Sequence, residues 1–328
     1  MRNTFLFIHR WLGIVFGVFI SVICLTGAVL VFSNEINSAA NRVSKPDEAT
    51  PLSADELIEA VNQWNTDGLT FVALQMPADD HHVAEAQFAE LGRNTLAVNP
   101  YTGEVLGQSG SAFVGFVRKM HRWLMMPPED THAGMSVGRV IVGSSAIAMT
   151  LILITGIILW WPKNRKMLKA RLSVRCNKGF RWFVYDSHVS LGAYAVIFLL
   201  LMSLTGPIFS FGWYRTAATK IAGGEQHEMF MNNPQHNDEH SAFEQPQAQK
   251  VRVTYPQSFD KPQGKLPVQV VFNQLHTGRI GGWTLRILYF LAALIGACLP
   301  WSGYYMWWKR THPKKNCLLS GRARRPYR

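Results

Sequence analysis

The chain has 328 residues, 48% of them hydrophobic, and its 33 Lys and Arg exceed its 21 Asp and Glu to give a formal net charge of +12. This length would allow two soluble domains, but the apolar residues are gathered into a few long segments, which argues against that class. The charge does not indicate nucleic acid as a partner, because most of the excess lies beside those segments, where it would meet anionic membrane lipid.

Four apolar segments are predicted to cross a membrane, because each has about 20 or more nearly uncharged residues, enough to span ~30 Å of hydrocarbon. They are 1–33, 136–161, 182–212 and 280–308. A secretory signal is the alternative for the first segment, but its apolar run is too long and three further spans follow it. Four buried helices of a soluble core are the weaker alternative for the set. We therefore expect an all-α bundle of four transmembrane helices.

The charged segments predict on which side of the membrane each connection lies. Segments 162–181 and 309–328 each contain eight Lys and Arg and no acid, so the positive-inside rule places them in the cytoplasm. Segment 34–135 has fourteen acids against six Lys and Arg and is expected outside, together with 213–279. The sequence thus predicts a multi-pass protein of the bacterial inner membrane with both termini cytoplasmic.

The first outer segment is predicted to form a compact α+β module over 34–110. Ser53-Ala-Asp-Glu56 is a capping box ahead of apolar residues at helical spacing. Short β-rich runs follow, and the turn sequence Asn99-Pro-Tyr-Thr-Gly103 precedes a last strand, as in a hairpin. The expected strands lie near 69–75, 82–88, 94–98 and 104–106.

The stretch 111–135 is predicted to contain an amphipathic helix from Phe113 to Met126, followed by a Pro127-Pro128 turn that leads into the second span. Its expected apolar face consists of Phe113, Phe116, Val117, Met120 and Leu124.

The second outer segment, 213–279, is less regular. Residues 223–249 are polar and are expected to form a mobile loop. Met and His residues between His227 and His240 would suit copper, although a solvated loop is the favoured interpretation. The stretches 250–255 and 266–272 are predicted to be strands that pack against the first module.

Comparison of the spans with one another indicates an internal duplication. The first and third spans share a histidine, a glycine four residues later and a Thr–Gly pair seventeen residues later, at His9, Gly13, Thr26-Gly27 and at His188, Gly192, Thr205-Gly206. The second and fourth share an arginine, a hydroxyl–Gly pair and a Trp–Trp pair, at Arg139, Thr155-Gly156, Trp160-Trp161 and at Arg286, Ser302-Gly303, Trp307-Trp308. Two repeated helix pairs of the same direction predict an approximate two-fold axis along the membrane normal.

Four histidines are the candidate ligands that this symmetry would bring into pairs. His9 is expected to face His188 at the cytoplasmic side, and His276 to face a partner at the outer side. For that partner His121 is favoured over His132, because His121-Arg-Trp-Leu124 repeats His9-Arg-Trp-Leu12. The repeat offsets alone do not choose between the two.

These histidines indicate a bound cofactor. A histidine in or beside a span is costly unless it binds something, and neutral imidazole is a usual axial ligand of haem iron. We therefore expect two b-type haems, held non-covalently because the chain has no C-x-x-C-H sequence. The Thr–Gly pairs are expected to pack helices closely or to leave room for a porphyrin, and Asp186 is expected to cap the third span. His81, His82 and His312 are expected to be surface residues.

These motifs resemble the PepSY-associated transmembrane family over nearly the whole chain, from His9-Arg-Trp-Leu-Gly13 through His121-Arg122 and Tyr185-Asp-Ser-His188 to Leu275-His-Thr-Gly278. The resemblance implies that the outer module is a periplasmic PepSY-like α+β module. It also implies similarity to inner-membrane reductases that pass electrons through two haems to ferric siderophores in the periplasm. Some relatives carry a fused cytoplasmic flavin-nucleotide reductase domain, whereas a basic tail follows Trp308 here, so the electron donor is not indicated.

The leading hypothesis is an oxidoreductase, a haem-dependent ferric-siderophore reductase. A donor on the cytoplasmic or membrane side would reduce the inner haem at His9 and His188, and the outer haem at His121 and His276 would pass the electron to a periplasmic ferric complex. The alternative is a non-enzymatic PepSY module, anchored by the spans, that binds or regulates a periplasmic partner. A permease is disfavoured because the spans lack broken helices and midplane charges.

Overall fold

The structure is a computed structural model that describes residues 1–92, 94–126, 136–223, 251–254 and 268–312. The chain forms two compact units. A helical unit comprises 1–28, 120–212 and 274–328, and an α+β unit comprises 29–119 and 213–273. The predicted loop 223–249, apart from its first residue, lies outside the described residues. So do His132 and the Pro127-Pro128 turn.

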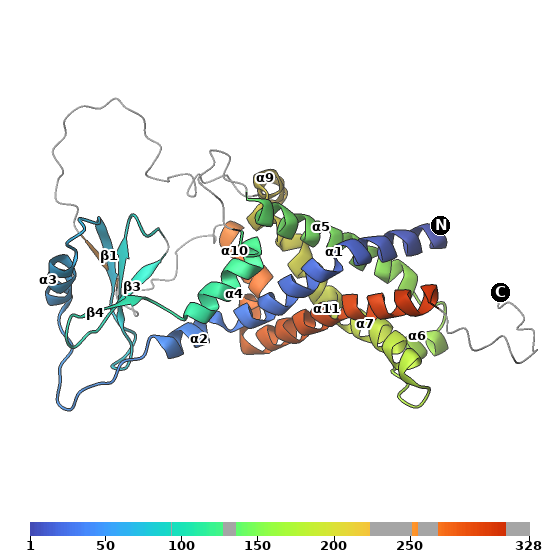
Figure 1. The fold of residues 1–328 in the computed structure, drawn as a ribbon, viewed down its shortest axis with the longest axis horizontal. Helices are drawn as coiled ribbons and strands as arrows, with labels where there is room; N and C mark the ends of the chain where they lie inside the picture. The colour runs from blue at the N-terminus through green and yellow to red at the C-terminus, as the bar shows by residue number, and fades with distance from the viewer. Residues whose placement is uncertain (93, 127–135, 224–250, 255–267, 313–328) are drawn as a thin grey trace, which may run out of the picture. The chain divides into compact units, whose positions relative to one another are not determined.

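Four long apolar helices make up most of the helical unit and run side by side in Figure 1. Their bounds are α1 Arg2–Val31, α5 Val137–Trp160, α7 Phe180–Thr205 and α11 Gly282–Thr311. Gly206 separates α7 from the short α8 Pro207–Ser210, and α7 and α8 together form one apolar stretch. All four are long and apolar enough to cross a membrane, as predicted from the sequence.

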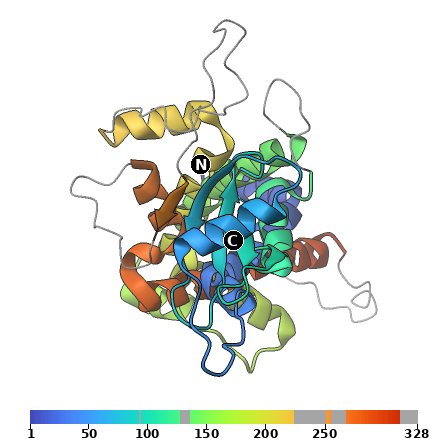
Figure 2. The same cartoon turned by 90° about the vertical axis from the view of Figure 1, so that its left-hand side faces the viewer.

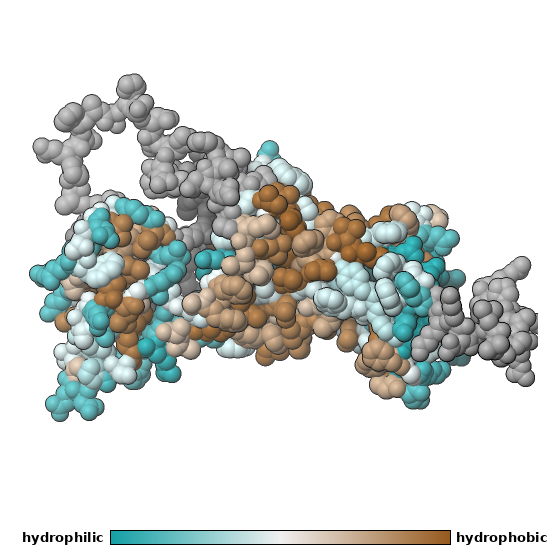
Figure 3. All heavy atoms as spheres, in the orientation of Figure 1, coloured by the Kyte–Doolittle hydropathy of each residue, from teal (hydrophilic) through white to brown (hydrophobic). Residues whose placement is uncertain are grey.

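The outward sides of these helices are apolar. Within the described residues, only 28–33% of the most apolar 18-residue stretch of each helix is buried, and Val15 and Ile197 are 59% and 61% exposed. Figure 3 shows hydrophobic surface over the middle of the bundle and hydrophilic residues at the end that carries the N-terminus of α1 and α6 Arg165–Arg171. Helices of a soluble core would be enclosed by protein, so this surface fits lipid as the surrounding medium.

Small side chains and hydroxyl groups hold the helices together. Ala195 and Leu199 of α7 pack against Leu153 of α5 and Ala292 of α11. The Ser21 hydroxyl of α1 donates to the carbonyl oxygen of Ala297 in α11 at 2.8 Å. Such contacts are typical of helix association in lipid, where apolar burial supplies little driving force.

The α+β unit contains a five-stranded sheet in the order β4-β3-β2-β1-β5. The strands are β1 Phe71–Gln75, β2 Ala84–Phe88, β3 Thr95–Val98, β4 Val105–Gln108 and β5 Arg252–Thr254. Neighbours in the order β1 to β4 are antiparallel, and β5 pairs in parallel with β1, with Leu74 opposite Val253. The prediction that the second outer segment packs against the first module is therefore confirmed for Arg252–Thr254, within the predicted strand 250–255.

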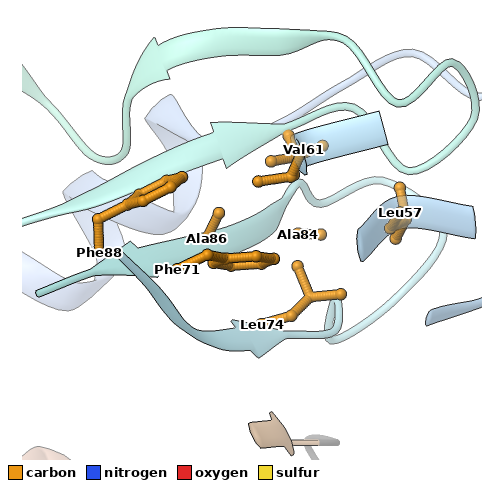
Figure 4. Packing of buried hydrophobic residues seen from close by; sticks show 8 residues of the cluster. Leu57, Val61, Phe71, Leu74, Ala84, Ala86 and Phe88 are labelled. Carbon is orange, nitrogen blue, oxygen red and sulfur yellow. The ribbon is translucent and has the colours of Figure 1, made fainter. Parts of the chain in front are cut away.

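Helix α3, Ala54–Trp64, lies across one face of this sheet (Figure 2). Leu57 and Val61 are fully buried against Phe71, Leu74 and Phe88, and the rings of Phe71 and Phe88 stack 5.2 Å apart (Figure 4). The predicted capping box is present, because Ser53 and Glu56 satisfy each other's backbone N–H groups. Gly103, at φ 73°, makes the predicted turn between β3 and β4.

The prediction of a strand over 266–272 is wrong, because the chain there forms the helix α10 Val268–Thr277. Its β-branched residues favour a strand by propensity. Its apolar residues nevertheless recur at the i, i+3, i+4, i+7 spacing of a helix, at Val268, Val271, Phe272 and Leu275. Periodicity was the better signal. A further helix, α9 Gly212–Ile221, was not predicted.

Asp186 is not the N-cap of the third span. Helix α7 begins six residues earlier, at Phe180, with Gly179 as its N-cap. The carboxylate of Asp186 is buried and accepts two bonds from the Arg175 guanidinium, at 2.6 Å from Nε and 2.7 Å from Nη2. The aspartate therefore ties the basic segment before α7 to the side of the helix.

The predicted amphipathic helix before the second span is α4, Ala112–Trp123. Of the expected apolar residues Val117 is buried, together with Val114, whereas Phe113 and Phe116 are exposed at 56% and 50%. The helix places His121 in its last turn.

Candidate functional site

The structure brings His9 and His188 together, as the repeat predicts. His9 lies in α1 and His188 in α7, and their ring centres are 6.3 Å apart with an interplanar angle of 85°. We call this the inner pair.

A second pair, which we call the outer pair, forms from His121 and His276. Their ring centres are also 6.3 Å apart, with an interplanar angle of 55°. Each histidine lies in the last turn of a short helix, α4 or α10. Left-handed backbone follows both turns: Leu124 and Met125 have φ of 49° and 62°, and Gly278 has φ of 71°. These conformations end the helices and fix where the two imidazoles lie.

Close packing also requires a glycine at position 278. A Cβ there would lie 2.8 Å from the ring of Tyr289, a fully buried residue of α11. The residue two positions after His276 thus packs its backbone directly on the fourth long helix. This contact holds the end of α10 against the bundle.

Each histidine of the inner pair contacts a hydroxyl group of the next long helix in the chain. His9 Nδ1 lies 3.2 Å from Thr155 Oγ1 and 3.0 Å from the carbonyl oxygen of Ile152, both in α5. His188 Nδ1 lies 2.7 Å from Ser302 Oγ in α11.

The outer pair has the same kind of contact, now with the helices that precede it. His121 Nδ1 lies 3.1 Å from Thr26 Oγ1 and 2.9 Å from the carbonyl oxygen of Ile23, both in α1. His276 Nδ1 lies 2.9 Å from Thr205 Oγ1 in α7. All four hydroxyls therefore belong to the hydroxyl–Gly pairs found by comparing the spans.

This network assigns the proton of each imidazole to Nδ1. A carbonyl oxygen can only accept, so the Nδ1 atoms of His9 and His121 must donate to it. All four hydroxyls donate their own proton to a carbonyl in the preceding turn, at 2.7 or 2.8 Å, and so they too accept from Nδ1. Each Nε2 is then left with a lone pair, which is the state that ligates a metal.

The glycine after the hydroxyl residue makes room for the imidazole. A Cβ on Gly27 would lie 3.0 Å from His121 Cε1, one on Gly156 would lie 3.3 Å from His9 Cε1, and one on Gly206 would lie 3.7 Å from His276 Cε1. These glycines were predicted to pack helices closely or to leave room for a porphyrin. In the structure a histidine ring lies beside each of the three.

The outer pair is neutral at pH 7. Burial lowers the pKa of His121 and of His276 to about 4. The nearby positive charge of Arg122 adds to this effect at His121, and the hydrogen bond to the Ile23 carbonyl opposes it. Both imidazoles can therefore serve as ligands without first losing a proton.

The spacing of both pairs fits a shared metal ion. Two imidazole nitrogens at about 2 Å from one metal place their ring centres roughly 6 Å apart, since each centre lies about 1 Å behind its nitrogen. The separation in the structure is 6.3 Å in both pairs. In the described part of the chain no third His, Cys, Asp or Glu joins either pair. A bare ion needs more protein ligands than two, whereas a haem brings its own four nitrogens and needs only axial ligands.

Buried donors beside the inner pair also fit such a group. Arg10 follows His9, and Trp160 lies one turn beyond Gly156. Arg10 Nε and Trp160 Nε1 are both buried, and within the described residues neither has a hydrogen-bond partner. Buried N–H groups normally have acceptors, and carboxylates such as those of a haem would provide them.

The remaining histidines of the described chain have other surroundings. His82 bonds to Ser38 and Asp79 in the α+β unit, His81 is exposed, and His312 stacks on Trp308 at 4.0 Å. Sequence reasoning missed the role of Thr26, Thr155, Thr205 and Ser302. Their signal was a hydroxyl before the glycine in all four spans.

The chain matches the family described as the PepSY-associated TM region over residues 6–310 and therefore belongs to this family. The match covers both histidine pairs and nearly all of the four long helices. No curated protein matches the chain. Family membership and four apolar helices together identify a membrane protein, as the motifs predicted. Haem binding and reductase activity stay predictions.

Proposed function

We propose that the protein is a transmembrane electron carrier that binds two b-type haems and reduces a periplasmic ferric complex, in keeping with the ferric-siderophore reductases that its motifs resemble. The observation that carries this proposal is the presence of two partly buried imidazole pairs with the same 6.3 Å spacing, in which Nδ1 of each ring is engaged by the protein so that Nε2 keeps its lone pair. When bound, the haems supply one-electron redox centres.

The placement of the pairs along the helices supports transfer across the bilayer. On α1, His9 of the inner pair and Thr26, which contacts the outer pair, are seventeen residues apart. That length of helix spans about 25 Å, close to the thickness of the hydrocarbon layer. The same offset separates His188 and Thr205 on α7. Each pair therefore serves one side of the membrane.

We further propose that the chain consists of two repeated halves, each with a complete set of contacts. In the first half Thr155 holds His9 and Thr26 holds His121. In the second half Ser302 holds His188 and Thr205 holds His276, in the same order along the chain. Each site takes one histidine from each half, which is the pattern that a two-fold axis along the membrane normal would produce.

The orientation follows from charge. Basic residues with no acid fill 162–181 and 309–328, which the positive-inside rule assigns to the cytoplasm. Both termini and the inner pair then lie on the cytoplasmic side of the inner membrane, and the outer pair and the α+β unit lie in the periplasm. The electron enters at the inner pair from a cytoplasmic or membrane donor. It leaves at the outer pair for the periplasmic ferric complex. Reduction of the iron(III) in that complex weakens its binding to hard oxygen ligands.

Spectra and haem quantification test this proposal. The purified protein is expected to contain two haems per chain with low-spin, bis-histidine spectra, and its dithionite-reduced form to be reoxidised by ferric siderophores. His9→Ala and His188→Ala should remove one and the same haem, while His121→Ala and His276→Ala should remove the other. His81→Ala, at an exposed position of the α+β unit, should retain both. A colourless protein would instead favour the anchored PepSY module that binds a periplasmic partner.

A further inference from the structure

The four hydroxyl–imidazole contacts have a directional property. Thr155 donates its proton to Leu151 at 2.8 Å, and Thr26 donates its own to Val22 at 2.7 Å. A hydroxyl whose single proton is already donated presents only lone pairs to a further neighbour. It can therefore act on the imidazole only as an acceptor of the Nδ1 proton.

We propose that Thr26, Thr155, Thr205 and Ser302 are positioning residues that orient the four histidines and set the reduction potential of each bound haem. The inference rests on the proposed function, since it concerns the same two pairs. The hydroxyl acts through the histidine and does not touch the iron.

The physical effect on the ligand has a definite sign. An acceptor at Nδ1 draws the proton away from the ring and raises the electron-donating strength of Nε2. A stronger donor favours the ferric over the ferrous state, which lowers the reduction potential. Removal of the hydroxyl leaves the backbone carbonyl as the sole acceptor, so the potential should rise.

The hydroxyls also account for the geometry of the rings. Each imidazole is held at Nδ1 by a side chain of a neighbouring helix, while the glycine that follows admits the ring edge in three of the four contacts. Rotation about the Cβ–Cγ bond would break this bond. The ring plane and the direction of Nε2 are thereby fixed before any group binds.

Other hydroxyls within the spans lack this arrangement and offer matched controls. Thr150 lies in α5, five residues before Thr155, and donates to the Ala146 carbonyl at 3.1 Å. Its other contact is the Ser203 hydroxyl at 3.0 Å, with no histidine involved. Thr150→Val therefore removes a hydroxyl from the same helix without touching a ligand.

The test is a redox titration of purified protein, with both haems quantified. Thr155→Val and Ser302→Ala should raise the potential of the inner haem and leave the outer one unchanged. Thr26→Val and Thr205→Val should do the reverse. Thr155→Ser, which keeps the hydroxyl, should restore the wild-type potential, and Thr150→Val should match the wild type at both haems.

The outcomes separate the two proposals. A wild-type protein without haem overturns the proposed function. If the protein binds two haems but their reduction potentials are the same in Thr155→Val as in Thr150→Val, the positioning role is overturned and the proposed function stands. If Thr155→Val loses the inner haem, retention of that haem in Thr155→Ser supports the role, because serine keeps the hydroxyl that valine lacks, and its loss in both variants contradicts it.

Discussion

At the scale of single residues, the absence of a side chain matters as much as its presence. Gly27 and Gly156 each stand after a threonine whose hydroxyl contacts a histidine, and each leaves room for the edge of that histidine's ring. A methyl group at either position would press on the imidazole itself rather than on a flexible neighbour. The Thr–Gly dipeptide thus acts as one unit, with a hydrogen-bond acceptor beside a gap.

Gly27→Ala tests this interpretation. The new Cβ would lie 3.0 Å from His121 Cε1, so the ring must move by a few tenths of an ångström. We expect roughly tenfold weaker retention of the outer haem, the lower end of the effect of disturbing a ligand's support, with the inner haem unchanged. Haem content after dialysis against apomyoglobin measures it. Gly115→Ala, where a Cβ would meet nothing within 4 Å, is the control, and equal loss in both variants would contradict the account.

At the scale of elements, one partly exposed ion pair ties a connection to a long helix. Asp186 of α7 is 5% exposed, whereas the Arg175 side chain that it binds is 41% exposed. The pair on the surface of the α+β unit, Lys45–Asp80, has the same 2.6 Å separation, but both partners are exposed. The two ion pairs are therefore expected to contribute differently to stability despite their equal separations, because only Asp186 is buried.

Asp186→Asn is expected to destabilise the protein by about 1–2 kcal/mol, below the full cost of breaking a buried pair because Arg175 reaches solvent. Asp80→Asn should have an effect within about 0.5 kcal/mol, as for other exposed pairs. Thermal denaturation in detergent, followed by the release of haem or by light scattering, compares the two. If both variants unfold at the same temperature as the wild type, the Asp186–Arg175 pair does not stabilise the protein as proposed.

How far the sequence predicts the elements depends on which physical signal each one carries. Long apolar runs and a capping box are local signals, and the helices α1, α5, α7, α11 and α3 were predicted from them. Helix α10 was missed because β propensity and helical periodicity disagree in a ten-residue run. Helix α4 was predicted from its amphipathic spacing, and Val117 of the expected apolar face is buried, together with Val114, which was not part of that face.

The candidate site likewise has a part that the sequence predicts and a part that it does not. The repeat predicts that His9 pairs with His188, whereas for the partner of His276 it leaves His121 and His132 open, and the local sequence His121-Arg-Trp-Leu124 favours His121. It does not predict what holds Nδ1 of each ring, since that depends on how helices 71 to 146 residues apart in the chain face one another. The hydroxyl contacts therefore required the structure.

At the scale of the whole molecule, the charge asymmetry makes a prediction about orientation. Cys176 is exposed in the basic segment before α7, and Trp64 is 45% exposed at the end of α3. In a Cys317→Ser background, a membrane-impermeant maleimide should label Cys176 in cells only after the inner membrane is opened. A W64C variant should be labelled once the outer membrane alone is permeable. Labelling of Cys176 in sealed spheroplasts would reverse the proposed topology.

The parallel pairing of β5 with β1 has a consequence for the order of events during synthesis. Leu74 and Thr254 meet in the sheet although they are 180 residues apart. Helices α5 and α7 are made in between. At about 5–20 residues per second, the ribosome needs roughly 9 to 36 seconds to cover that distance. Throughout this interval β1 is an open edge that can recruit another strand, so the nascent α+β unit is expected to need a chaperone until the third helix has been inserted.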